Sequence, residues 1–172
     1  MKHQDIQREG AERAEEVRDV TQKPFWELSG KLIAACIEVH QILGPGLLEG
    51  IYEAALVHEL ELRGIRVQRQ LEVPIFYKDV LLAHSLRLDL LIDNNIVLEI
   101  KSIGAVLPLH KAQLLSYLRL TKRPLGLLVN FNTSHLKQGL HRVVNTHKND
   151  SCTSSPPLPP TPSRLRVERY SK

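Results

Sequence analysis

A change in the spacing of apolar residues near Gly64 constrains the fold of this chain more than any other feature. Before that glycine, apolar residues recur at helical spacing over residues 28–43 and 48–60, which indicates two helices. The sequence Gly44-Pro45-Gly46 separates them, because glycine and proline together interrupt a helix. After Gly64, short runs rich in β-branched and aromatic residues favour strands. This order of elements predicts a mixed α/β sandwich.

The second half of the pattern predicts the remaining elements. Three strands are expected to form an antiparallel meander, with polar turns between them, over Val67–Tyr77, Leu81–Ile92 and Ile96–Ser102. Pro108 is placed to open a third helix, and the apolar run Leu125–Phe131 is typical of a buried strand. Residues 135–145 fit either a last strand or a short helix.

One domain is expected, between two segments of different composition. A chain of 172 residues that is 42% hydrophobic can bury one core of ordinary size. Residues 1–23 form a charged extension with few large apolar side chains, residues 24–147 carry the domain, and residues 148–172 form a basic tail rich in Pro and Ser. We expect this tail to be disordered and dispensable for folding, and its PxxP spacings fit a linker better than an adaptor-binding motif.

Charge, cysteine content and hydropathy limit the partners and the location of the protein. The formal net charge of +4 is compatible with a polyanionic partner. The sequence lacks the dense stripe of basic residues that is typical of a DNA-coating protein. The two cysteines, Cys36 and Cys152, provide no disulfide framework. No apolar run reaches the roughly 18 residues that span a bilayer, and residues 1–20 lack the apolar region of a signal peptide. These patterns predict a cytoplasmic protein without a membrane segment and leave its oligomeric state open.

The densest chemical signal lies inside two of the predicted strands. Asp89 is followed ten residues later by Glu99-Ile100-Lys101, and all of these charges stand among apolar neighbours. Burying a carboxylate without a compensating partner is costly. Two carboxylates in one core therefore favour a hard divalent cation such as Mg²⁺ or Mn²⁺ between them. Because side chains alternate along a strand, Glu99 and Lys101 share one face and Ile100 points to the other.

The predicted loop Asp93-Asn94-Asn95 decides whether the two acids meet. A three-residue loop pairs Ile92 with Ile96 and places Asp89 opposite Glu99 on one face. A two-residue loop would shift the register by one residue and send the acids to opposite faces, which would remove the site.

The spacing of the acids also fits a structural network. Asp89 could pair with Arg87 or Lys101 at a half-solvated sheet edge, which costs little and performs no chemistry. Short patterns such as D-x9-E-x-K recur by chance, so a second signal is needed. The sequence offers no other type of site, because it has no HExxH motif, no Cys/His cluster and no phosphate-binding Gly-rich loop.

Ordered blocks of sequence provide the second signal. Gly46-Leu47-Leu48-Glu49-Gly50-Ile51-Tyr52 matches a GxxExxY signature, and further matching blocks cover residues 87–91, 98–101, 110–118 and 126–131. From about Leu28 to Val144 the chain resembles the GxxExxY protein family, which is assigned to the PD-(D/E)XK nuclease superfamily. Ser102 departs from that pattern, since a small apolar residue is expected after the lysine. The resemblance implies a restriction-endonuclease-like fold, a mixed sheet flanked by helices.

The same resemblance implies a function. Asp89 and Glu99 would hold Mg²⁺ or Mn²⁺, the backbone carbonyl of Ile100 would complete the metal shell, and Lys101 would orient or deprotonate the attacking water. The expected reaction is metal-dependent hydrolysis of phosphodiester bonds, with DNA as the expected partner. Two alternatives stay open: a catalytically silent nuclease fold that binds nucleic acid, and an interaction module that acts through the Pro-rich tail.

Five further residues are candidates for auxiliary roles. Glu49, Tyr52 and Glu53 share a helical face by their spacing, and by resemblance a glutamate there extends the metal shell. A solvated helix face explains the two glutamates nearly as well, and Tyr52 alone is typical of a core residue. Gln113 and Tyr117 match the Q-x-x-x-Y pair that contacts substrate or supports the site in exonuclease-like branches of the superfamily. The alternative is an amphipathic helix in which Tyr117 only packs.

Overall fold

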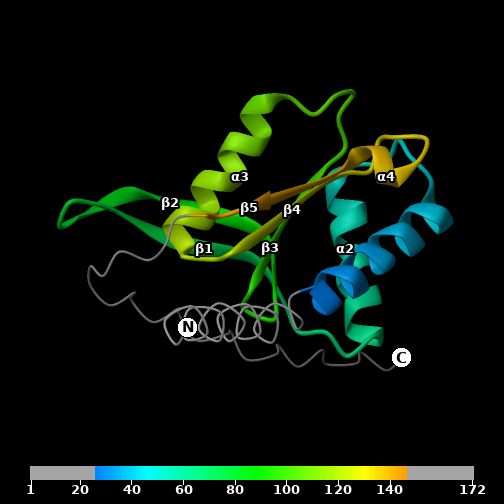
Figure 1. The fold of residues 1–172 in the computed structure, drawn as a ribbon, viewed down its shortest axis with the longest axis horizontal. Coiled ribbons are helices and arrows are strands. Elements are labelled where there is room, and N and C mark those ends of the chain that lie inside the picture. Colours follow the sequence, from blue (N-terminus) through cyan, green and yellow to red (C-terminus); the bar gives the residue numbers. More distant parts are fainter. Residues whose placement is uncertain (1–25, 147–172) are drawn as a thin grey trace, which may run out of the picture.

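A five-stranded sheet organises the structure, a computed structural model that describes residues 26–146 (Figure 1). The strands lie in sequence order across the sheet: β1 (Val67–Tyr77), β2 (Val80–Ile92), β3 (Ile96–Lys101), β4 (Leu125–Asn130) and β5 (Leu140–Val144). All neighbouring strands are antiparallel except β3 and β4, which run parallel. The expected extension over residues 1–23, the expected tail from residue 148 and Cys152 lie outside the described residues.

Helices flank both faces of this sheet (Figure 1). A helix over residues 26–43 and α2 (Glu49–Leu62) contribute to one hydrophobic cluster, and α3 (Pro108–Thr121) contributes to another. The ambiguous segment 135–145 contains both of its predicted alternatives, because the single turn α4 (Leu136–Gly139) leads directly into β5. The predicted mixed sheet flanked by helices is confirmed. Among residues 26–146, no helix is both long and apolar enough to cross a membrane.

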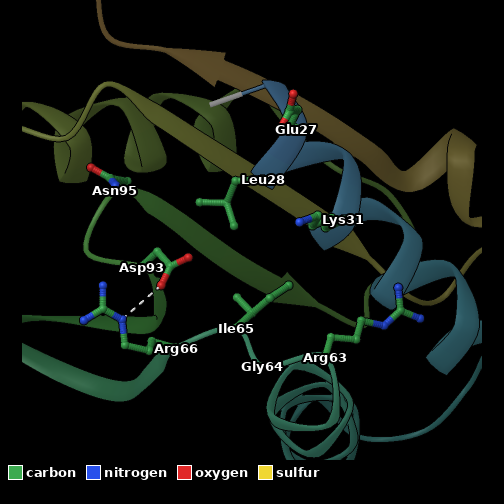
Figure 2. Close-up of a pocket in the computed structure, with 9 residues that line it drawn as sticks. All are labelled: Glu27, Leu28, Lys31, Arg63, Gly64, Ile65, Arg66, Asp93 and Asn95. Carbon is green, nitrogen blue, oxygen red and sulfur yellow. Dashed lines mark hydrogen bonds and ion pairs between the residues drawn. The ribbon is translucent and has the colours of Figure 1, made fainter. Parts of the chain in front are cut away.

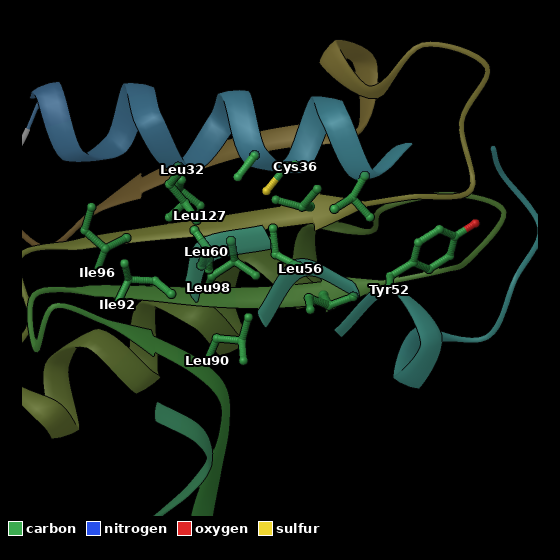
Figure 3. Close-up of a cluster of buried hydrophobic side chains, with 14 of the residues drawn as sticks. Leu32, Cys36, Tyr52, Leu56, Leu60, Leu90, Ile92, Ile96, Leu98 and Leu127 are labelled. Atoms are coloured by element: carbon green, nitrogen blue, oxygen red, sulfur yellow. The ribbon is translucent and has the colours of Figure 1, made fainter. Parts of the chain in front are cut away.

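The larger cluster joins the first helix and α2 to the sheet (Figure 3). Fully burying one leucine or isoleucine contributes about 1.5–3 kcal/mol relative to leaving it exposed, so a cluster of this kind fixes where α2 lies. Its members include Leu32, Cys36, Leu56, Leu60, Ile96, Leu98 and Leu127. Along β3 the even-numbered residues face this cluster, while Val97 belongs to the cluster beside α3. The alternation therefore places Glu99 on the face of the sheet that α3 covers.

The turn between β2 and β3 has the predicted three-residue form. Ile92 pairs with Ile96 across residues 93–95. Asp93 and Asn94 have left-handed φ values of 46° and 59°, which short polar side chains tolerate better than others. The predicted pairing of Ile92 with Ile96 is confirmed, and the two-residue loop does not form. The ladder continues to Leu90 and Leu98 and ends one residue short of Asp89 and Glu99.

Candidate functional site

Asp89 lies where β2 and β3 separate. The pairing between these strands ends at Leu90 and Leu98. Beyond that point the N–H of Ile100 donates a 2.9 Å hydrogen bond to Oδ2 of Asp89. The side chain of Asp89 thus takes the place of a main-chain acceptor and is fixed against β3. Burial raises the pKa of Asp89, and the Ile100 N–H and the charge of Lys101 only partly oppose that shift.

Glu99 is buried, with 5% of its surface exposed, and its carboxylate is only half satisfied. Oε1 accepts a 2.7 Å hydrogen bond from Nζ of Lys101, whereas Oε2 is buried without a hydrogen-bond partner. Burial and the neighbouring charge of Asp89 raise the pKa of Glu99. Burial disfavours the charge of Lys101, but its bond to Glu99 and the surrounding acids outweigh burial and raise its pKa. The site therefore holds two crowded carboxylates and one ammonium.

Glu49 begins α2 and reaches the same site. Its Oε1 accepts a 2.9 Å hydrogen bond from the N–H of Ser102, and Oγ of Ser102 donates a 2.6 Å bond to the carbonyl of Leu47. The charge of Glu49 makes a small contribution to the raised pKa values of Asp89 and Glu99. Ser102, the departure from the expected pattern, thus links the end of β3 to the start of α2.

Glu53 lies one turn further along α2 and is also buried, with 7% of its surface exposed. Its two carboxylate oxygens accept hydrogen bonds from Nε of Arg69 at 2.9 Å and from Nε2 of Gln70 at 2.5 Å. Both donors come from β1. That Glu53 extends a metal shell stays a prediction, and each of its oxygens already has a protein donor.

Tyr52 lies in the core rather than among the acids. Its ring stacks on Phe131 with ring centroids 4.4 Å apart, and none of its surface is exposed. Its hydroxyl donates to the carbonyl of Gly44 at 2.6 Å and accepts from the N–H of Leu47 at 3.1 Å. The tyrosine of the GxxExxY signature therefore holds the loop before α2, which is the core alternative expected for Tyr52.

Gln113 and Tyr117 form a pair on α3 beside the acids. Nε2 of Gln113 donates a hydrogen bond to the hydroxyl of Tyr117. Burial raises the pKa of Tyr117, and the charges of Glu99, Lys101 and Asp89 also act on it. Tyr117 is therefore within electrostatic range of these three charged residues. Tyr117 also packs against the cluster beside α3, so it has the packing role of the alternative prediction as well.

Asn130, at the end of β4, is a neighbour of the candidate site that sequence reasoning did not single out. It is 2% exposed and lies opposite Lys101 in the parallel ladder. Its Oδ1 accepts from the N–H of Ile103 at 3.0 Å, and its Nδ2 donates to the carbonyl of Ile103 at 2.8 Å. These bonds hold the chain that follows Lys101. The available signal was a single amide residue inside an apolar strand.

The chemistry of these residues fits a divalent cation of the Mg²⁺ type. Among the residues that the structure describes, no three or more His, Cys, Asp and Glu side chains gather into a ready metal cage. Mg²⁺, however, is usually bound through one or two carboxylates and keeps several waters. The buried, unpartnered oxygen of Glu99 next to a second carboxylate is where such an ion would supply the missing partner.

A pocket of about 440 Å³ lies at the other end of β3 (Figure 2). It is lined by the first helix, the connection between α2 and β1, and the turn between β2 and β3. Its lining contains the ion pair of Arg66 with Asp93 at 3.3 Å, and Arg63 pairs with Glu59, which lies outside the lining, at 2.5 Å. None of the candidate site residues lines it, so the pocket is separate from the acid site.

Comparison with known proteins places the chain in a superfamily. The family model of the PD-(D/E)XK nuclease superfamily matches residues 26–143, which is more than half of the chain. No curated protein and no solved structure matches it significantly. The matched range includes both acids and Lys101. It also contains the whole sheet, apart from the last residue of β5. The chain belongs to the PD-(D/E)XK nuclease superfamily.

Proposed function

We propose that this protein is a divalent-metal-dependent nuclease that hydrolyses phosphodiester bonds in DNA. Membership of the superfamily supports a nuclease-like function and a nucleic acid substrate in general. The observation that supports a metal-dependent nuclease in particular is the buried carboxylate of Glu99. One of its oxygens accepts a hydrogen bond from Lys101, and the other has no hydrogen-bond partner. A purely structural network would satisfy both oxygens, because an unsatisfied buried acceptor costs about 1–3 kcal/mol.

The chain's own residues have distinct roles in this proposal. Asp89, Glu99 and the backbone carbonyl of Ile100 hold Mg²⁺ or Mn²⁺. When bound, the ion supplies a water of lowered pKa and polarises the scissile phosphate. The Ile100 N–H keeps Asp89 oriented through its 2.9 Å bond to Oδ2. Lys101 keeps its proton because its pKa is raised, so it orients the attacking water and offsets charge that develops on the phosphate.

The auxiliary residues complete this arrangement. Oε1 of Glu49 is bound to the Ser102 N–H, and we assign its Oε2 to the outer part of the metal shell. Gln113 and Tyr117 are proposed to contact the substrate beside the acids, since their hydrogen-bonded pair lies near them. The GxxExxY family is the proposed subdivision of the superfamily, supported by the signature at residues 46–52.

The test is cleavage of matched DNA and RNA by the full chain with Mg²⁺, with Mn²⁺ and with a chelator. The expected result is metal-dependent cleavage of DNA that is lost in the variants Asp89→Asn and Glu99→Gln. Equal loss in both variants, with circular dichroism unchanged, would support a shared metal. No cleavage of any substrate with either ion would overturn the proposal.

A catalytically silent binding protein is the second candidate. The observation that favours it is the lack, within residues 26–146, of a group of three or more metal-ligating side chains. Filter binding across a range of salt concentrations separates the two candidates. Binding that weakens with salt, without cleavage under any metal condition, would establish the silent form.

A further inference from the structure

The alternation of side chains between the two faces of the sheet is interrupted in strand β2 at Asp89. In an uninterrupted strand, residues two positions apart face the same side of the sheet. Leu88 nevertheless belongs to the cluster beside α3, whereas Leu90 belongs to the cluster beside α2. The regular alternation is therefore broken between these two leucines, at the level of Asp89.

Strand β1 changes face at the same level. Val67 packs with the cluster beside α2 and Leu71 with the cluster beside α3, although an even number of residues separates them. Between them Gln70 has a left-handed φ of 48°. The β1–β2 pairs on either side of Gln70 flank Asp89 on the other strand, so the two breaks lie side by side. A residue other than glycine in this conformation is strained, and such strain concentrates at functional sites.

The carboxylate of Glu53 links the irregular segment of β1 to α2 by hydrogen bonds. It accepts hydrogen bonds from Arg69 and Gln70, two successive residues at the break. The side chain of Glu53 is 10% exposed, whereas that of Arg69 is 49% exposed. The strained residue is thus held through its side chain by a buried acceptor on a helix that the core keeps in place.

We propose that Glu53 is a positioning residue for Asp89. Through Arg69 and Gln70 it holds the change of face that turns the Asp89 carboxylate toward the N–H of Ile100 and toward Glu99. Irregular pairing next to an active site commonly re-aims a side chain in this way. The catalytic consequence rests on the proposed function, but the positioning itself is a property of the metal-free protein.

Glu59 on the same helix provides a matched control. It also accepts a hydrogen bond from an arginine, Arg63, at 2.5 Å, but that arginine directly follows α2 and is not part of β1. Glu53→Gln and Glu59→Gln each weaken one carboxylate–arginine pair on α2. If Glu53 only stabilises the fold, the two variants should differ in melting temperature alone.

The first measurement uses the Ile100 amide resonance of the metal-free protein, because that N–H is bonded to Asp89. Asp89→Ala gives the chemical shift of the amide without this bond. We expect Glu53→Gln to move the resonance toward the Asp89→Ala position and Glu59→Gln to leave it in place. A resonance at the parent position in folded Glu53→Gln would overturn the proposal.

The second measurement is Mn²⁺ affinity by calorimetry, with DNA cleavage as a companion. Loss of a residue that orients a metal ligand typically weakens metal affinity or activity about 10–100-fold, so we expect a loss of that size in Glu53→Gln. Glu59→Gln should match the parent. Parent-like affinity in Glu53→Gln would contradict a role toward the site. If instead the parent binds no metal while the Ile100 resonance moves as expected, the positioning stands and the proposed function fails.

Discussion

The charged side chains at the two ends of β3 differ in how far they are paired. At the end near the β2–β3 turn, a pocket of about 440 Å³ is lined by several charged residues, among them the ion pair of Arg66 with Asp93. At the other end, Asp89 and Glu99 are crowded into the sheet with raised pKa values, and one oxygen of Glu99 has no partner. None of the candidate site residues lines this pocket. Unsatisfied charge, rather than volume, marks the candidate site.

Two buried glutamates repeat the contrast at the scale of single residues. Glu53 and Glu99 are exposed by 7% and 5%, respectively. Each oxygen of Glu53 has a donor, from Arg69 or from Gln70, whereas Glu99 has a donor on one oxygen only. Burial of an acid does not identify a metal ligand by itself, because protein donors can satisfy it fully.

The largest effect that sharpens this comparison is expected for Lys101→Met, which keeps the volume of the side-chain stem and removes its charge. Turnover of DNA should fall by orders of magnitude, because an ammonium that stabilises the transition state is lost. Metal affinity should hold or rise, since a cation competing for Glu99 is gone. Single-turnover cleavage and a Mn²⁺ titration of the same protein measure both quantities. Cleavage at the parent rate would show that Lys101 is not catalytic.

A smaller effect is expected on the stability of the metal-free protein. The folded-state pKa values of Asp89 and Glu99 are raised, so the folded protein binds protons more tightly than the unfolded chain, and stability falls as pH rises from the ordinary carboxyl range through the raised values. Asp89→Asn keeps an acceptor for the Ile100 N–H and removes one charge. We therefore expect its melting temperature at neutral pH to exceed that of the parent by a few degrees.

Thermal melts across pH test this sign. The advantage of Asp89→Asn should shrink as the pH is lowered into the acid range, because the parent carboxyls then bind protons. Added Mn²⁺ should stabilise the parent and not the variant. A variant that melts below the parent at every pH would indicate that Asp89 serves the fold.

The smallest effect is expected at the pocket. Arg66→Gln removes an ion pair whose arginine side chain is 88% exposed, and exposed pairs contribute little because solvent screens them. Stability should change by no more than about 0.5 kcal/mol, and DNA cleavage and Mn²⁺ affinity should stay at parent values. Loss of DNA cleavage in Arg66→Gln would contradict the distinction between the pocket and the acid site, because it would assign a function to the pocket.

The sequence predicted much of this architecture because its signals are local. Gly44-Pro45-Gly46 and Gly64 mark the ends of two helices, and left-handed φ values at Asp93 and Asn94 follow from residues that tolerate them. That loop fixed the register as far as Leu90 and Leu98, next to Asp89 and Glu99. The strand bounds also agreed, apart from single residues at some ends, such as Ser102, which lies just beyond β3.

The rest depends on tertiary contacts that no local pattern encodes. Gln70 has no intrinsic preference for a positive φ, so the break in β1 is visible only once Glu53 accepts its side-chain amide. The bonds of Asn130 to Ile103 likewise join the end of β4 to the loop after β3, far apart in the sequence. Helical spacing placed Glu49, Tyr52 and Glu53 on one face, but each of them reaches a different neighbour.

The most direct test of the central claim is a calorimetric titration of the metal-free protein with Mn²⁺, in parallel with Asp89→Asn, Glu99→Gln and Lys101→Met. If the two acids hold one divalent cation, the parent and Lys101→Met will bind a single ion, and each acid variant will lose that binding. Undiminished affinity in both acid variants, or no binding by the parent under conditions in which it is folded, would contradict the account.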